Sequence, residues 1–200
     1  MTFASTDFGR TFRPLAILSG MLALVMAVCG GVSAARAETP AAYMQRVANE
    51  LMAASRTGST SAMAAVIRAH ADVPSIGLNA LGSYRERLPQ TDRPAYYNGM
   101  INFIARYGAK EAPKYPVGKA IMVGQSQATG QVYYVDSRVT LRDGTTYDVR
   151  WIINRRGADY KVRDAEVIGF RMTSFLDNLF QDFIGNNGGN PRALVIALNK

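Results

Sequence analysis

Residues 131–154 read QVYYVDSRVTLRDGTTYDVRWIIN, and their apolar and polar side chains alternate along two runs separated by Asp143 and Gly144. One face of these runs carries Tyr133, Val135, Val139, Leu141, Tyr147, Val149, Trp151 and Ile153. The other face carries Asp136, Arg138, Thr140, Asp148, Arg150 and Asn154. A period of two predicts β-strands with one face in water, and the Asp-Gly pair predicts a tight hairpin turn between them.

The same strand pattern continues on both sides of this hairpin. Residues 120–127 and 160–168 also read as strands, with turns at Thr129-Gly130 and at residues 155–157, so four strands form an antiparallel meander. Residues 40–108 instead show apolar side chains three to four apart, which predicts helices, and residues 173–184 and 191–200 predict two more. The fold class is therefore α+β, with a helical N-terminal half packed on a four-stranded sheet and C-terminal helices.

The N-terminus has the pattern of an export signal. Arg10 and Arg13 precede an apolar run at residues 15–28, and Ala35 and Ala37 form an A-x-A cleavage pattern. The run is too short for a membrane span, which needs about 20 apolar residues, although an uncleaved anchor stays open as an alternative. We expect residues 1–37 to be a signal peptide cleaved after Ala37, residues 38–200 to form one domain, and the mature chain to lie in the periplasm.

Composition excludes several function classes. The chain carries a formal charge of +8, and loss of Arg10, Arg13, Arg36 and Asp7 with the signal peptide leaves +6. The basic residues form no run interleaved with aromatic side chains, so we expect no nucleic-acid partner. The only cysteine, Cys29, lies in the signal peptide, and the only histidine, His70, has the position of a capping or surface residue. We therefore expect no metal site and no cofactor.

No group of residues indicates catalysis. The serines lack a nucleophile-elbow context, and no glycine-rich phosphate loop follows a strand. The carboxyl groups on the predicted strands belong to Asp136, Asp148, Asp164 and Glu166, and the alternation places the first two on the polar face, where they are solvated or paired. We expect no catalytic residue and no enzyme activity.

A set of residues in a fixed order along the mature chain resembles a known family. The set comprises Asp72, Val73 and Ile76; Ala80, Leu81, Gly82, Tyr84 and Arg85; Arg93; Tyr97, Phe103 and Tyr107; Tyr147, Val149 and Trp151; Tyr160, Lys161, Val162 and Asp164; and Gly169, Met172, Gly188 and Gly189. With this order and spacing the chain resembles the MlaC, or toluene-tolerance auxiliary, proteins of ABC transport systems. Phe170-Arg171-Met172 departs from the more usual Val-Ser-Leu type of run.

The resemblance implies a monomeric periplasmic carrier with an NTF2-like shape that encloses an apolar lipid pocket. Its cargo would be phospholipid, and its partners an outer-membrane lipoprotein complex and an inner-membrane ABC transporter complex that maintain lipid asymmetry. The expected lining is Leu81, Met100, Phe103, Ile104, Val135, Val139, Tyr147, Val149, Trp151, Val162, Ile168, Phe175, Leu179 and Phe180. We expect the headgroup to stay in water, without a dedicated site.

Three alternatives remain open at this stage. The cargo could be another apolar lipid, such as a hopanoid. An NTF2-like enzyme would instead point Tyr134, Asp136 or Asp164 into the apolar pocket. An interaction module without a ligand would fill the same space with side chains, because a pocket wall and a core have the same composition.

Overall fold

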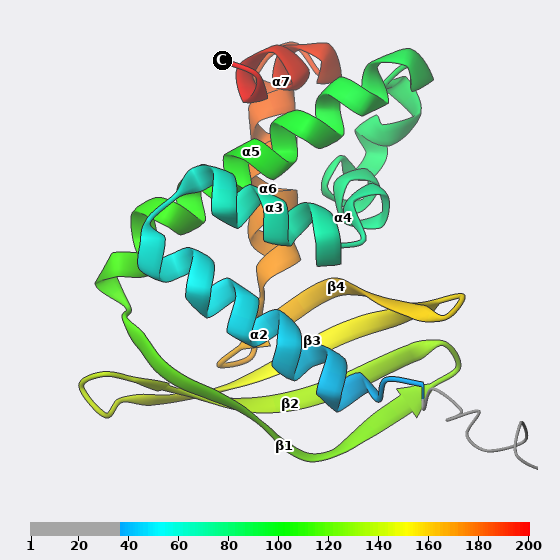
Figure 1. Cartoon of the computed structure of the whole chain (residues 1–200). Helices are drawn as coiled ribbons and strands as arrows, with labels where there is room; N and C mark the ends of the chain where they lie inside the picture. Colours follow the sequence, from blue (N-terminus) through cyan, green and yellow to red (C-terminus); the bar gives the residue numbers. More distant parts are fainter. Residues whose placement is uncertain (1–36) are drawn as a thin grey trace, which may run out of the picture. The chain divides into compact units, whose positions relative to one another are not determined.

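The computed structural model describes residues 37–200, and the predicted signal peptide therefore lies, except for Ala37, outside the described residues. The helices are α2 (Pro40–Thr57), α3 (Thr60–His70), α4 (Val73–Ala80), α5 (Arg93–Glu111), α6 (Met172–Asn186) and α7 (Pro191–Leu198). Short 3₁₀ turns at Gly82–Arg87 and Gln90–Asp92 lie between α4 and α5, and a third at Ala112–Lys114 follows α5. Figure 1 shows α2 lying across the sheet and the other helices gathered beyond strand β4.

The sheet is an antiparallel meander in the order β1-β2-β3-β4-β5. Its strands are β1 (Val117–Thr129), β2 (Val132–Leu141), β3 (Thr146–Arg156), β4 (Asp159–Val167) and β5 (Phe170–Arg171). The predicted α+β class and meander are confirmed, and the structure adds a fifth strand. That strand has two residues, which is too short to produce an alternating pattern in the sequence.

The turn between β4 and β5 holds an unusual backbone conformation. Ile168 has a φ of 51° and the following Gly169 a φ of 79°. Two successive positive φ angles are typical of a tight hairpin, where Asn-Gly is preferred because a β-branched side chain is strained in this region. Ile168 therefore ends the strand instead of continuing it, and its side chain is exposed.

Helix α2 covers one part of the apolar sheet face. Tyr43, Met44 and Val47 pack against Val135 and Ile153 in a filled cluster. The side chain of Gln45 also reaches the outer strand: its Nε2 donates to the carbonyl of Ala120 at 2.9 Å, and its Oε1 accepts from the N–H of Met122 at 3.3 Å. Helix α2 is thus fixed to the sheet by apolar packing and by the backbone of β1.

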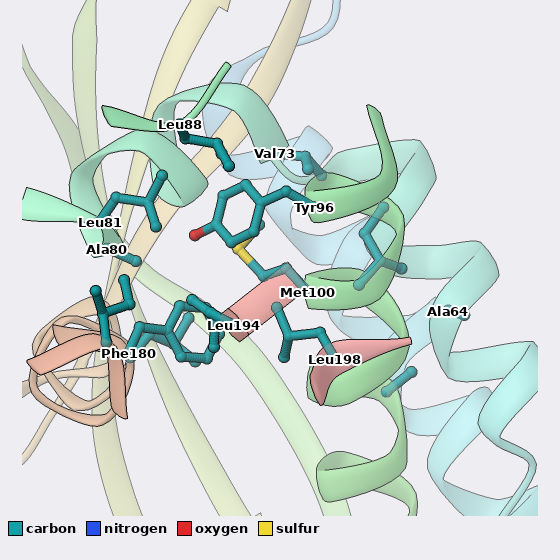
Figure 2. Close-up of a cluster of buried hydrophobic side chains, with 14 of the residues drawn as sticks. Ala64, Val73, Ala80, Leu81, Leu88, Tyr96, Met100, Phe180, Leu194 and Leu198 are labelled. Carbon is teal, nitrogen blue, oxygen red and sulfur yellow. The ribbon is translucent and has the colours of Figure 1, made fainter. Parts of the chain in front are cut away.

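A second core lies among the helices alone. Leu176, Phe180 and Ile184 are four residues apart on α6, so they share one helix face, and all three are buried. They pack with residues of α4, α5 and α7. Figure 2 shows Phe180 beside Leu194, and Leu81, Tyr96 and Met100 in the same cluster. The helical half therefore has its own filled core.

An ion pair with a buried acidic end joins this helical half to the sheet. Asp72 stands just before α4, its N–H donates to the carbonyl of Val162 at 2.8 Å, and its carboxylate accepts from Arg156 Nη2 at 2.7 Å. Burial of the carboxyl would raise the pKa of Asp72, but the hydrogen bonds of Arg156 and Ser75 and the charge of Arg156 together outweigh burial and lower it. Because only 5% of the Asp72 side chain is exposed, this pair is shielded from solvent at its acidic end.

We expect Asp72→Asn to lower the free energy of unfolding by about 1–2 kcal/mol at pH 7. The folded-state pKa lies below the unfolded value of about 3.9, so the ion pair stabilises the fold above that value. Its contribution is lost as the pH falls through the folded-state pKa, and the difference between wild type and variant should shrink accordingly. Urea denaturation at pH 7 and at pH 3 measures both quantities.

The matched control is Asp148→Asn, which removes the exposed pair between Asp148 and Arg138 on the outer face of the sheet. That change should have no measurable effect on unfolding at either pH, because water screens an exposed pair. An equal loss for Asp72→Asn at both pH values would contradict the assignment of an ionised Asp72.

Candidate functional site

An apolar cavity of about 210 Å³ lies where the helices meet strand β4. We call this space the apolar cavity. Its lining is Ile67, Ala71, Ile76, Phe103, Ile104, Tyr107, Val162, Arg163, Asp164, Ala165, Met172, Thr173, Phe175 and Leu176. The side chains come from α3, α4, α5, α6 and β4, so segments far apart in the sequence form one wall (Figure 1).

Aromatic side chains define the mouth and the back of the apolar cavity. The rings of Tyr107 and Phe175 lie 5.8 Å apart, and both side chains are nearly half exposed. Phe103 stands one helical turn before Tyr107 on α5, and its ring packs edge to face against buried Phe180 at 5.8 Å. The apolar cavity therefore opens to solvent beside two aromatic rings and ends against the helical core.

Asp164 is the one carboxyl in the cavity wall, and its hydrogen bonds are internal. Its Oδ1 accepts from the N–H of Ala165 at 2.8 Å and of Thr173 at 3.1 Å, while its Oδ2 accepts from Thr173 Oγ1 at 2.7 Å. Thr173 is in the first turn of α6, so the carboxylate caps this helix and ties it to β4. Both oxygens of Asp164 are thus occupied in holding the wall together.

A second apolar space, which we call the sheet hollow, continues on the same face of the sheet. It has a volume of about 320 Å³ and is lined by Tyr115, Val117, Val139, Leu141, Tyr147, Val149 and Val167. Ala165 of the apolar cavity pairs with Trp151, and Val167 of the sheet hollow pairs with Val149. Alternate residues of a strand share a face, so the two spaces are neighbours along β4.

The structure divides the fourteen predicted lining residues among four places. Those in the apolar cavity are Phe103, Ile104, Val162 and Phe175, and those in the sheet hollow are Val139, Tyr147 and Val149. Those in filled packing are Leu81, Met100 and Phe180 in the helical core, and Val135 and Trp151 under α2. Ile168 and Leu179 are exposed, at 66% and 38%.

Several lining residues were not predicted, and two of them carry a recognisable signal. Ile67, Ala71, Ile76, Tyr107, Ala165, Met172 and Leu176 line the apolar cavity beside the predicted residues. Tyr107 lies three residues after Ile104 and four after Phe103, and Met172 lies three before Phe175, which is the spacing of one helix face. Tyr107 and Met172 could therefore have been predicted as residues one helical turn away from Phe103, Ile104 and Phe175.

The remaining polar candidates lie elsewhere. His70 is buried, contrary to the surface position expected from the sequence: its Nε2 lies 2.7 Å from Glu50 Oε2 and its Nδ1 lies 3.3 Å from the hydroxyl of Tyr43. Burial raises the pKa of Tyr43 to about 12, so this phenol stays protonated at neutral pH. Asp136 pairs with Arg150 at 2.8 Å on the sheet face opposite α2, and Tyr134 shares that face.

No helix within residues 37–200 is long and apolar enough to cross a membrane. Within the same range, no three His, Asp or Glu side chains come together in a way that could hold a metal ion.

The sequence model of the MlaC protein family matches residues 39–200, which is almost all of the described chain. The chain belongs to the MlaC family. The predicted family is therefore confirmed over the whole α+β domain. No curated protein matches the chain by sequence.

A solved structure confirms the fold of this MlaC-family chain. It is the phospholipid-binding protein from Ralstonia solanacearum, determined in complex with a phospholipid. The two structures agree with a TM-score of 0.62 at 17% sequence identity, over 80% of this chain and 94% of the other. At this identity the likeness establishes a shared fold, with the helices and the open antiparallel sheet in common.

Proposed function

We propose that this chain is a periplasmic lipid carrier that binds the acyl chains of a phospholipid. In this proposal it travels as a monomer between an outer-membrane lipoprotein complex and an inner-membrane ABC transporter, and so helps to maintain lipid asymmetry. The observation that carries the proposal is the apolar cavity, which opens to solvent beside Tyr107 and Phe175. Membership of the MlaC family and the phospholipid in the Ralstonia protein support it.

The energetics favour a carrier with more than one apolar space. Removing one methylene from water is favourable by roughly 0.8 kcal/mol of free energy. A phospholipid has about 30 methylenes, so its unaided passage through the water between two membranes costs on the order of 20 kcal/mol. A cavity of about 210 Å³ holds only a short length of hydrocarbon. We infer that acyl chains run from the apolar cavity along β4 into the sheet hollow, which offers a further 320 Å³.

The arrangement supports binding. The carboxyl in the cavity wall is engaged in the structure, because Asp164 accepts hydrogen bonds from Ala165 and Thr173 and so ties α6 to β4. Asp177 has a pKa raised by burial and by the charge of Asp164, yet it is not among the residues that line the apolar cavity.

The test uses the full chain expressed in a Gram-negative host, with the protein purified from the periplasmic fraction. Denaturing mass spectrometry should give the mass of residues 38–200 together with about one phospholipid per chain. Intact mass that retains residues 1–37 would contradict cleavage after Ala37. Folded protein that repeatedly carries no lipid and extracts none from vesicles would contradict the carrier function, and a hopanoid in place of phospholipid would change the cargo.

A further inference from the structure

Large apolar side chains are exposed beside the mouth of the apolar cavity. The two most exposed ones among residues 37–200 are Phe170, at 77%, and Ile168, which flank Gly169 in the strained turn between β4 and β5. Met172 and Phe175 follow in α6, line the apolar cavity and are each nearly half exposed. Strained residues cluster at functional sites, and exposed apolar patches mark surfaces that contact a partner.

The exposed surface continues from the apolar cavity to the sheet hollow. Tyr107 packs beside Phe175, with the two rings 5.8 Å apart. Tyr115 lines the sheet hollow and is more than half exposed, and Val167, which lines the same hollow, directly precedes Ile168. Exposed apolar and aromatic side chains therefore lie beside both apolar spaces. We call this surface the mouth face, and it comprises Tyr107, Tyr115, Ile168, Phe170, Met172 and Phe175.

Positive charge borders the mouth face. Lys110 is one helical turn after Tyr107 on α5. Arg56 and Arg142 line a cavity of about 390 Å³ that shares Val117 with the sheet hollow. All three basic side chains are exposed, and within residues 37–200 none of them forms an ion pair. Figure 1 shows the C-terminal ends of α2 and α5 and the β2–β3 hairpin together on its left side.

The acids in the same segments leave an excess of positive charge. Glu111 pairs with Lys114 at 2.8 Å, and the carboxylate of Asp143 accepts a hydrogen bond within the turn between β2 and β3. The exposed cations that remain are Arg56, Lys110 and Arg142. The surface that complements this end of the domain is therefore anionic.

Two features favour a lipid bilayer over an acidic protein as the partner. Tyrosines between apolar and basic side chains are typical of the membrane–water interface, where the ring lies among the lipids and the hydroxyl lies in water. The mouth face also borders the opening through which a lipid would enter. A bilayer in contact with this face would shorten the passage of acyl chains through water, which is the unfavourable part of the transfer.

We propose that the mouth face docks directly on the surface of a bilayer that contains anionic phospholipid. Phe170 and Ile168 enter the boundary between headgroups and acyl chains, while Arg56, Lys110 and Arg142 stay among the headgroups. The contact is reversible, because one short hairpin buries far less apolar area than a membrane-spanning helix. The proposal rests on the proposed carrier function, since it describes how the apolar cavity comes to face a membrane.

The experiment measures binding of the purified exported protein to vesicles by flotation. One set of vesicles is phosphatidylcholine alone, and the other is a mixture of phosphatidylcholine and phosphatidylglycerol. Wild type should bind the mixed vesicles at least about tenfold more tightly at low salt, and high salt should reduce this preference. Phe170→Ser should weaken binding to the mixed vesicles about tenfold, and Arg142→Gln should weaken it about fivefold.

Ile196→Ser and Arg85→Gln are the matched controls. Ile196 is exposed on α7, and Arg85 is exposed with Glu86 as its ion-pair partner. These changes remove one exposed apolar side chain and one positive charge outside the mouth face, so both variants should bind vesicles as wild type does. All four variants should keep their bound lipid, since none of the four residues lines the apolar cavity or the sheet hollow.

Wild type that binds neither set of vesicles, or equal binding by wild type, Phe170→Ser and Arg142→Gln, would overturn the docking proposal and leave the carrier function intact. Bound lipid is measured in the same samples, so a chain that carries none would reject the carrier function separately. Binding to native inner-membrane vesicles that protease treatment of those vesicles abolishes, without binding to protein-free vesicles, would make the mouth face a protein-docking site and overturn the bilayer assignment.

Discussion

Ile104→Glu protein should be folded and free of bound lipid. Ile104 lines the apolar cavity from α5 and is only partly buried, so the helix tolerates a longer polar side chain there. A carboxylate that faces acyl chains costs several kcal/mol or must take up a proton. We expect the lipid content per chain, measured by denaturing mass spectrometry, to fall at least tenfold.

The matched control for this change is Ile196→Glu. Ile196 is 60% exposed on α7 and is not among the residues that line the apolar cavity. Its replacement should leave both the lipid content and the thermal transition as in wild type. Phe175→Glu provides a second test at the exposed mouth, where unfolding is least expected. Full lipid content in folded Ile104→Glu and Phe175→Glu would show that lipid binds elsewhere.

Phe180→Ala should have the opposite effect, a large loss of stability with lipid retained. Phe180 is 1% exposed and packs against Tyr96 and Phe103 in the helical core. Truncating a buried phenylalanine removes apolar burial and leaves a cavity, which costs about 3–5 kcal/mol. Urea denaturation of lipid-free protein measures this loss, because bound lipid would itself stabilise the folded state.

The neighbouring residue provides the control for Phe180. Leu179 is 38% exposed, so Leu179→Ala should lower the free energy of unfolding by less than about 1 kcal/mol. The folded fraction of Phe180→Ala should still bind lipid, since the apolar cavity ends against this ring without being lined by it. A variant that kept its stability and lost its lipid would place Phe180 in the lining and not in the core.

Local patterns were sufficient to predict the sheet and most helices. Period-two alternation correctly placed Val135, Val149 and Ile153 on the apolar face of the sheet, because strand geometry alone decides which side a residue occupies. The same argument assigned Ile168 to the end of a strand, where the structure has a turn. Strain at a single residue leaves no periodic trace in a sequence.

The alternation pattern does not show which part of an apolar sheet face is filled by packing and which part lines a hollow. Val135 is covered because α2 crosses the sheet there, whereas Val149 faces the sheet hollow. Both valines are buried residues of an alternating strand and look the same in the sequence. Their difference depends on contacts between segments about ninety to a hundred residues apart, beyond the reach of a local pattern.

The irregularity in β4 could not be predicted for a related reason. The pairing with β3 steps from Ile152–Asp164 to Ile153–Val162, so Arg163 has no partner and interrupts the alternation of the strand. In the sequence Arg163 is one more charged residue on a strand. Only the register against β3 shows the bulge.

Gln45 has a consequence for how copies of this chain behave at high concentration. An outer strand offers unpaired N–H and C=O groups, and a second copy of the same strand is their natural partner in aggregates. The amide of Gln45 fills these positions at Ala120 and Met122, much as a neighbouring strand would. The opposite edge of the sheet is the two-residue β5, which offers little length for pairing. Both features hinder the addition of strands from other copies to this sheet.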